Sequence, residues 1–231
     1  MLRNELTFPH QTFLGRIDDQ SWEQLSSLWS VRKYAPRTLI ISAEDSDSSD
    51  VFFVIDGTVR ATIYTDAGRE VSFLSFSNGD CIGEFSALDE APRSSDVVAE
   101  KESLVARLSA EQFRAVVKTN PDVSYALLML MIGHLRRLSK RVVDFNAKTA
   151  DQRLRSEILS LAKSRAGDAD EVIIDRPPTQ SQMASVVFSS RESVAREMGR
   201  MRKAGVAFRI KRSLHIPSIE KFESYMETAA P

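Results

Sequence analysis

The chain has 231 residues, enough for one large domain or two small ones, and its composition (42% hydrophobic, 27% charged) is that of an ordinary globular protein. A net charge of −1 excludes a surface that attracts nucleic acid everywhere, and one cysteine, Cys81, excludes an intrachain disulfide or a structural zinc or iron–sulfur site. The longest apolar run, residues 125–132, is too short to cross a bilayer, and no signal-peptide pattern is present. We therefore expect a cytoplasmic protein without a membrane partner, with Cys81 as a packing residue.

The first half of the chain predicts one short helix and then many short strands. Capping residues Asp18 and Asp19 precede a helix at about residues 20–29. Strand-like segments separated by turn residues, including turns at 66–68 and 78–80, follow at residues 38–42, 51–55, 58–64 and 71–75. This pattern predicts an antiparallel barrel or sandwich. The acidic stretch 44–50 lacks the spacing of a calcium loop and is interpreted as a solvated hairpin tip.

The stretch from Gly83 to Ala99 carries the residues that a nucleotide would need. A turn that starts a short helix presents free backbone N–H groups to an anion. Arg93 can hold one phosphate through two parallel hydrogen bonds, and the hydroxyls of Ser94 and Ser95 add donors. An ionised Glu84 only accepts hydrogen bonds, so a ribose hydroxyl is its natural partner. One anion clamp beside one sugar acceptor predicts a nucleotide monophosphate.

The order Gly-Glu-x-x-Ala-Leu from Gly83, followed by Pro-Arg-Ser-Ser-x-Val-x-Ala up to Ala99, resembles the phosphate-binding cassette of cyclic-nucleotide-binding domains. The resemblance implies that Glu84 holds the ribose 2′-hydroxyl and that Arg93 pairs with the cyclic phosphate, with Ser94 beside it. A surface turn with an Arg–Glu salt bridge is the alternative, but it leaves the shared register of Gly, Glu, Pro and Arg unexplained. The nucleotide-binding residues expected in this stretch are Gly83, Glu84, Phe85, Ser86, Arg93, Ser94 and Ser95.

Pro121 predicts the start of the longest helix, at about residues 122–147. Apolar residues recur along it at alternating intervals of three and four, as in the seam of a coiled coil. The members of this stripe are Leu128, Met131, Leu135, Leu138, Val142 and Phe145. The stripe is narrower than the apolar face of a globular helix, which favours a two-stranded homodimer seam over packing on its own domain.

The C-terminal part carries the basic excess of the chain. Residues 1–150 hold 17 Lys+Arg and 21 Asp+Glu, whereas residues 151–231 hold 14 and 11. Thr179 can cap a short helix, and Ser190 can cap a second at residues 191–203, whose core face is Val194, Met198 and Met201. Two short helices joined by a tight turn predict a helix-turn-helix. Its second helix carries Arg and Glu near its start, and in the major groove Arg matches guanine and Glu accepts from cytosine. A solvated helix face is the alternative.

The order Ser-Arg-Glu-Ser-Val-Ala-Arg from Ser190 to Arg196 resembles the start of the recognition helix in the Crp/Fnr superfamily of bacterial regulators. The resemblance implies that Arg191, Glu192 and Arg196 read a TGTGA half-site of a palindromic operator, with RNA polymerase as a further partner. Residues 204–216 are similar to the family's wing hairpin, whose Arg209, Lys211 and Arg212 would lie near phosphates. The full set of expected DNA-binding residues is Thr179, Gln180, Ser190, Arg191, Glu192, Ser193, Arg196, Arg200, Lys211 and Arg212.

The resemblance covers nearly the whole chain and implies an α+β fold. It places an antiparallel β-roll or jelly-roll cyclic-nucleotide-binding domain at residues 1–121, a dimerisation helix at 122–148 and a winged helix-turn-helix at 149–231. Two departures affect function. Phe188 occupies a turn position that usually holds a small residue, and since a bulky side chain disfavours positive φ we expect this turn to differ. Leu138 and Ser139 stand where the cyclic-AMP branch has a Thr-Ser pair that contacts the purine, and the loss of one hydroxyl at Leu138 weakens the case for strict selectivity. Cyclic AMP is the expected ligand, and cyclic GMP stays open.

Three other functions stay open. The chain can be a regulator of the same fold that responds to another effector or acts constitutively; among the candidate haem ligands, His134 is interpreted as a polar flank of the long helix. It can be a cyclic-nucleotide module that regulates another protein, although the basic stretch 191–212 argues against this. An enzyme is least expected, because no metal-ligand cluster and no nucleophile–base pair is present in the sequence. We therefore expect no catalytic residues and no metal.

Overall fold

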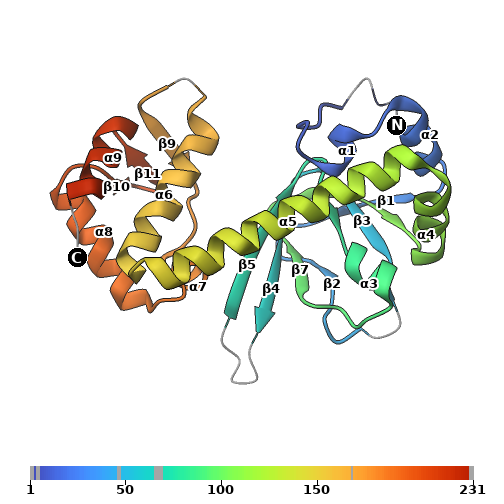
Figure 1. Ribbon diagram of the computed structural model, residues 1–231, viewed down its shortest axis with the longest axis horizontal. Coiled ribbons are helices and arrows are strands. Elements are labelled where there is room, and N and C mark those ends of the chain that lie inside the picture. Colours follow the sequence, from blue (N-terminus) through green and yellow to red (C-terminus); the bar gives the residue numbers. More distant parts are fainter. Residues whose placement is uncertain (1–2, 4–5, 46–47, 65–69, 168, 229–231) are drawn as a thin grey trace. The chain divides into compact units, whose positions relative to one another are not determined.

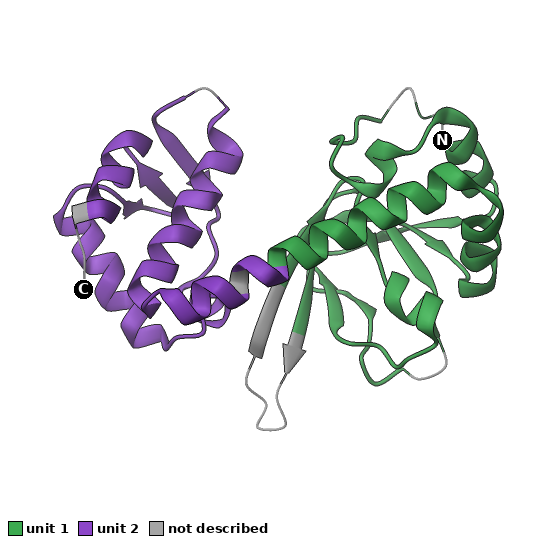
Figure 2. Cartoon of the chain, viewed as in Figure 1, with its two compact units in different colours: residues 1–137 green, residues 138–231 purple. Residues whose placement is uncertain are grey.

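The computed structural model describes Arg3 and residues 6–45, 48–64, 70–167 and 169–228 (Figure 1). The expected turn at 66–68 and residues 46–47 of the acidic stretch lie outside the described residues. The chain forms two compact units, residues 1–137 and 138–231 (Figure 2). The long helix α5 (Pro121–Ala147) contributes to both units. The finer division into three parts stays a prediction.

The first unit contains two antiparallel sheets in its described residues. One has the strand order β1-β8-β3-β6 and the other β2-β7-β4-β5. The strands are β1 (Ser30–Tyr34), β2 (Leu39–Ile41), β3 (Val51–Asp56), β4 (Thr58–Tyr64), β5 (Glu70–Ser77), β6 (Cys81–Ile82), β7 (Asp96–Ala99) and β8 (Ser103–Leu108). The helices are α1 (Phe13–Arg16), α2 (Asp19–Ser26), α3 (Glu84–Asp89) and α4 (Ala110–Thr119), followed by the first part of α5. This arrangement confirms the predicted antiparallel fold of the N-terminal part.

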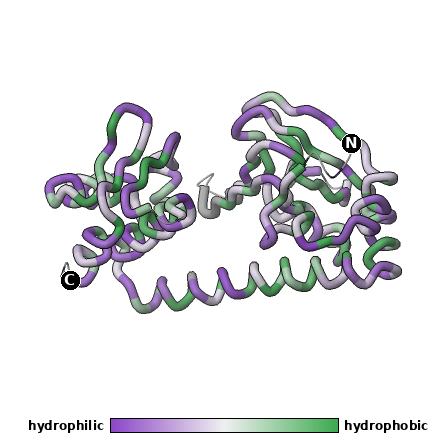
Figure 3. Tube along the Cα trace, turned by 90° about the horizontal axis from the view of Figure 1, so that it is seen from above, coloured by the Kyte–Doolittle hydropathy of each residue, from purple (hydrophilic) through white to green (hydrophobic). Residues whose placement is uncertain are grey.

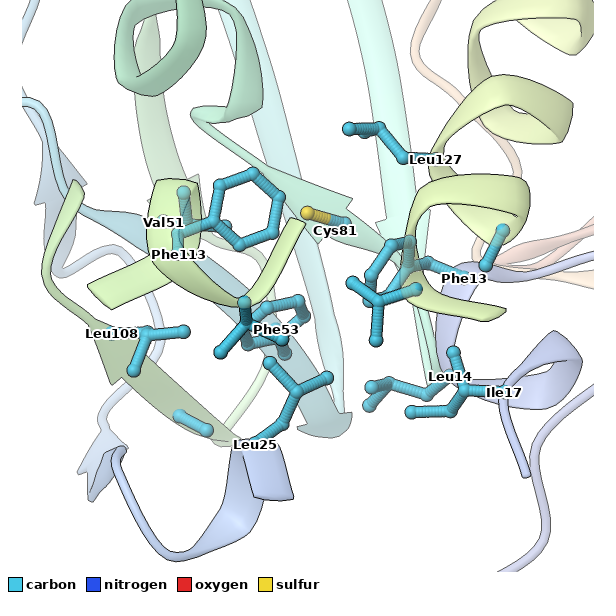
Figure 4. Close-up of a cluster of buried hydrophobic side chains, with 14 of the residues drawn as sticks. Phe13, Leu14, Ile17, Leu25, Val51, Phe53, Cys81, Leu108, Phe113 and Leu127 are labelled. Atoms are coloured by element: carbon cyan, nitrogen blue, oxygen red, sulfur yellow. The ribbon is translucent and has the colours of Figure 1, made fainter. Parts of the chain in front are cut away.

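Strand β3 is buried on both faces, which explains its uninterrupted apolar sequence. Phe53 packs with the helices, and its ring lies 5.5 Å from that of Phe13, between centroids. Phe52 points to the other face and packs with the second sheet. Figure 4 shows Phe53 and Cys81 in the helix-side core. Cys81 is buried in this core, so its expected packing role is confirmed. The same burial raises the pKa of its thiol well above the ordinary value.

Helix α5 has two apolar faces. Val123, Ala126 and Leu127 are buried in the core of the first unit, so part of the helix does pack on its own domain. Other apolar side chains are exposed, and Figure 3 shows hydrophobic and hydrophilic residues alternating along the helix. The exposed apolar residues are Tyr125, Leu128, Ile132, Leu135, Leu138, Val142, Val143 and Phe145. Five of the six residues in the predicted seam are therefore exposed, and Met131 packs partly against the core.

The second unit combines helices with a small antiparallel sheet. Its elements are α6 (Ala150–Ala166), β9 (Val172–Asp175), α7 (Gln180–Val186), α8 (Arg191–Lys203), β10 (Phe208–Ile210), β11 (Ser213–Ile216) and α9 (Ile219–Thr228). Strand β11 pairs with β10 and with β9, for example Leu214 with Ile174. The core of this unit includes the three predicted residues of α8, namely Val194, Met198 and Met201. A helix-turn-helix followed by a β-hairpin confirms the predicted C-terminal fold, to which the structure adds β9 and α9.

None of the helices in the described part of the chain combines the length and the apolar sequence needed to cross a membrane. Within the same residues, no three His, Cys, Asp or Glu side chains form a group that could hold a metal ion.

Candidate functional site

The predicted cassette begins at a backbone position that requires glycine. Gly83 connects β6 to α3 with φ of +84°. A Cβ atom on Gly83 would lie 2.6 Å from Nη1 of Arg93 and 2.8 Å from the carbonyl oxygen of Asp50. The left-handed conformation and the close approach both exclude a side chain here. Gly83 therefore acts through the backbone, by letting Arg93 lie directly against the start of α3.

Arg93 is only 8% exposed and is fixed by main-chain acceptors. Its Nη2 donates to the carbonyl of Asp50 over 2.7 Å, and its Nη1 donates to the carbonyl of Gly83 over 3.2 Å. Burial lowers the pKa of Arg93, and nearby carboxylates, that of Asp50 first, act in the opposite direction. Because a guanidinium has five N–H donors, these two carbonyl bonds orient the group and leave further donors for an anion.

Glu84 is 4% exposed and lies in the first turn of α3. Burial raises the pKa of Glu84 to about 7, against the opposing effect of its own backbone amide and of Arg93. Its Oε1 lies 3.9 Å from Nδ1 of His134 on α5. Burial, assisted by the charge of Arg137, lowers the pKa of His134 to about 4. The imidazole is therefore neutral near pH 7, and the Glu84–His134 contact is not an ion pair there.

His134 also lies edge-on to Phe85, with ring centroids 5.9 Å apart. The sequence interpretation of His134 as a polar flank was wrong, because its side chain lies against the cassette and is only 15% exposed. One signal was available: His134 lies one helical turn before Leu138, a position already expected to contact the purine. The contact itself joins two residues that are distant in the sequence, which no local motif reveals.

The other predicted cassette residues have different surroundings. Ser86 is buried, and its hydroxyl donates to the carbonyl of Pro92 over 3.5 Å, which ties α3 to the segment that carries Arg93. Ser94 is exposed and Ser95 is half-buried, whereas Phe85 is largely exposed. Leu138 and Ser139 are exposed residues of α5 that belong to the second unit. The structure thus brings together Gly83, Glu84, Ser86 and Arg93, to which it adds His134.

The second candidate site is the exposed start of α8. Ser190 caps this helix by accepting a hydrogen bond from the amide of Ser193. Arg191, Glu192 and Arg196 are all exposed in its first two turns. A bond from its own backbone amide and one from the Ser190 hydroxyl lower the pKa of Glu192, which keeps this side chain an ionised acceptor. An ionised acceptor between two arginines is a suitable surface for reading base edges.

Several predicted DNA-binding residues have structural roles in this unit. Thr179 caps α7 in a capping box with Gln182. Arg200 pairs with Asp151 of α6 and with Glu197, a residue that has no exposed surface and also binds Arg155 at 2.5 Å. Arg200 therefore fastens α8 to α6, while its contact with DNA stays a prediction. Ser193 accepts a hydrogen bond from Arg196, and Gln180 is half-buried.

The turn at Phe188 does not differ in the way that the sequence predicted. Phe188 adopts φ of +51°, the left-handed conformation that glycine usually provides. A non-glycine residue there costs about 1–2 kcal/mol, so other contacts must offset the strain. On the wing, Lys211 also has positive φ, and both Lys211 and Arg212 are exposed. Arg209 donates to the carbonyl of Pro178, so its guanidinium is partly engaged within the unit.

Comparison with known proteins identifies the family of each part of the chain. The cyclic nucleotide-binding domain family matches residues 31–120, and the Crp-like helix-turn-helix domain matches residues 152–225. The two matched stretches together make up more than half of the chain. The chain is a two-domain protein that combines a cyclic-nucleotide-binding fold with a DNA-binding fold. It belongs to the Crp/Fnr family of transcription regulators.

Among the curated relatives is the cAMP-activated global transcriptional regulator CRP of Salmonella typhimurium, 27% identical over 77% of this chain and 85% of the relative. The structure is similar to the c-di-GMP-responsive regulator CLP of Xanthomonas campestris, with TM-score 0.71 and 19% identity over 87% of this chain and all of CLP. It is also similar to CprK in complex with OCPA, with TM-score 0.69 and 14% identity over 90% of this chain and 94% of CprK. These two likenesses concern the fold alone.

Proposed function

We propose that this regulator binds cyclic AMP in the cassette and thereby controls its binding to DNA. The observation that carries the proposal is that Glu84 and Arg93 are both buried and both lie next to the left-handed Gly83. Arg93, oriented by two carbonyl bonds, offers its remaining donors to the cyclic phosphate. Glu84, once ionised, accepts from the ribose 2′-hydroxyl. A surface salt bridge alone would not bury both groups.

Cyclic AMP is the first ligand to test, because the curated relatives CRP and Vfr are named as cAMP-activated regulators. Cyclic GMP is the second. Ser94 is exposed beside Arg93, where its hydroxyl is available to a guanine amino group or to the phosphate. Leu138 offers no hydroxyl to an adenine, which weakens the case for strict selectivity. In both cases the nucleotide is an allosteric ligand, and we assign the protein no catalytic activity.

The DNA-bound form that we propose is a homodimer on a palindromic, TGTGA-like operator. The exposed apolar residues of α5 supply the dimer seam, and each protomer inserts the start of α8 into a major groove. Arg191, Glu192 and Arg196 read base edges, while Lys211 and Arg212 of the wing contact phosphates. A regulator of this kind acts in the bacterial cytoplasm, with RNA polymerase as its further partner.

The cassette assignment is tested by titration calorimetry of nucleotide-stripped protein. Arg93→Ala should abolish binding of cyclic AMP and of cyclic GMP, because the buried cation for the phosphate is lost. Arg32→Ala, which removes an exposed arginine of β1 outside the cassette, is the matched control and should bind like the wild type. Nucleotide binding retained by a folded Arg93→Ala protein would refute the assignment.

A second candidate function is a regulator of the same fold with a different effector. It is favoured by two proteins of similar fold, the c-di-GMP-responsive regulator CLP and CprK in complex with OCPA. The same calorimetry separates the two functions. Wild-type protein that binds neither cyclic nucleotide would favour this second candidate.

A further inference from the structure

Three side chains from separate segments of the second unit meet at the turn between α7 and α8. Phe145 comes from the last turn of α5, Arg153 from the first turn of α6, and Phe188 from the turn itself. The rings of Phe145 and Phe188 lie edge to face, with centroids 5.7 Å apart and planes at 79°. The guanidinium of Arg153 lies 5.0 Å from the centre of the Phe145 ring. We call these three residues the hinge clamp.

Arg153 joins two chain connections through main-chain carbonyls. Its Nη1 donates to the carbonyl of Lys148, just after the end of α5, over 2.7 Å. Its Nε donates to the carbonyl of Val187 at the end of α7 over 2.9 Å, and its Nη2 reaches that of Phe188 over 3.4 Å. Carbonyls at helix C-termini lack partners within the helix, so one arginine satisfies acceptors at the ends of both helices. A point charge such as lysine would not supply this fork of donors.

Phe188 adopts a strained backbone conformation to take part in this contact. Its φ of +51° is one that glycine adopts freely and a phenylalanine does not. The ring is half exposed, so core burial does not explain its presence. The side chain gains the edge-to-face contact with Phe145. The main-chain carbonyl of the same residue accepts a hydrogen bond from Arg153. The strained residue is therefore held by the end of α5.

The start of α8, the helix proposed to read the bases, follows this turn directly. Ser190 caps α8 only two residues after Phe188, and Arg191 and Glu192 come next. The same continuous helix whose last turn holds Phe145 carries His134 beside Glu84. A shift of the last turn of α5 would therefore be passed to the base-reading side chains through the packed rings and three hydrogen bonds of the hinge clamp.

We propose that Phe145, Arg153 and Phe188 are positioning residues that couple the nucleotide site to DNA reading. This inference rests on the proposed function. It gives the Phe145 ring a role in the hinge clamp in addition to its predicted place in the dimer seam. The clamp needs an aromatic residue at the left-handed position of the turn.

The test is fluorescence anisotropy of the full-length protein with a labelled palindromic TGTGA-type duplex, with and without saturating cyclic AMP. The ratio of the two dissociation constants is the coupling factor. Phe188→Gly, which keeps the left-handed backbone, and Phe145→Leu should each lower this factor about fivefold while leaving the affinity for cyclic AMP alone within about twofold. Phe145→Tyr keeps the ring and should retain the coupling. Ile173→Ala removes an exposed apolar side chain of β9 and is the matched control.

A second readout separates failure of the clamp from failure of the proposed function. Amide hydrogen exchange of the full chain reports the order of residues 189–193 without any nucleotide. Phe145→Leu and Phe188→Gly should speed exchange there, and Ile173→Ala should not. Folded variants with wild-type coupling and wild-type exchange would overturn the inference. If cyclic AMP has no effect on DNA binding by the wild type, the proposed function fails, and the exchange data alone decide whether the clamp exists.

Discussion

At the scale of single residues, the cassette depends on Glu84, whose pKa lies near neutral pH. Burial of Glu84 raises its pKa from 4.5 to about 7, so the carboxyl binds a proton in the folded protein that it would release in the unfolded chain. The folded state therefore loses stability as the pH rises from about 4.5 through 7, by about 3 kcal/mol in total. Ionising the buried carboxyl costs free energy in the unliganded site, and a hydrogen bond from a bound ribose hydroxyl would offset that cost.

The affinity for cyclic AMP should consequently fall as the pH is lowered. Only the ionised Glu84 accepts from the ribose hydroxyl, so calorimetry should give an affinity about tenfold lower at about pH 6 than at about pH 8. His134 stays neutral over this range, because its pKa is about 4. Glu84→Gln should bind weakly and without this pH dependence. Glu100→Gln, at another partly buried carboxylate whose pKa burial raises, should keep the wild-type profile.

At the scale of elements, α5 has one apolar face buried in the first unit and another that is exposed. Its residues Val123, Ala126 and Leu127 are buried in the first unit, whereas Leu135, Leu138 and Val142 expose 65%, 57% and 62% of their surface. Exposed apolar side chains in a regular stripe favour a partner helix, and in the proposed homodimer a second copy of α5 would provide one. Helix α8 is divided in the same way, into a buried face and an exposed start that carries Arg191 and Glu192.

Leu138→Asp should convert the dimer to a monomer, because two carboxylates would face each other across the seam. Light scattering with size-exclusion chromatography measures this directly. Leu39→Asp introduces the same charge at a comparably exposed leucine of β2 and should leave the dimer intact. A dimer that persists in Leu138→Asp would contradict the seam.

Two arginines of α8 should give opposite results. Arg191→Ala should weaken binding to a cognate duplex by about 1–3 kcal/mol and relax one base position, with unchanged stability. Arg200→Ala should lower the free energy of unfolding by about 1 kcal/mol, since Glu197 and Asp151 lose a partner. Anisotropy and denaturant titration of both variants check this. Equal effects of the two variants on base preference would contradict the separation of roles.

At the scale of the whole molecule, the parts predicted from sequence were those encoded in contiguous residues. The cassette, the stripe of α5 and the helix-turn-helix each occupy one uninterrupted stretch. Turn chemistry and periodicity indicated these stretches, and the resemblance of the cassette and of the start of α8 to known families supplied the roles of their residues. The contacts that complete the sites join distant residues: Arg93 with the carbonyl of Asp50, Glu84 with His134, and Arg200 with Asp151. Strand register and helix packing create these pairs, and no local pattern reports them. The left-handed Phe188 was mispredicted because its cost is local, whereas the contacts that offset it come from α5 and α6.

The central claim is that a cyclic nucleotide bound at Glu84 and Arg93 controls DNA binding by α8. The most direct measurement is the affinity of nucleotide-stripped protein for a palindromic TGTGA-type duplex, with cyclic AMP, with cyclic GMP and without either, in the wild type and in Arg93→Ala. We predict an affinity about tenfold higher or more with cyclic AMP for the wild type, and no change for Arg93→Ala. Equal affinity in all conditions for the wild type would contradict nucleotide control.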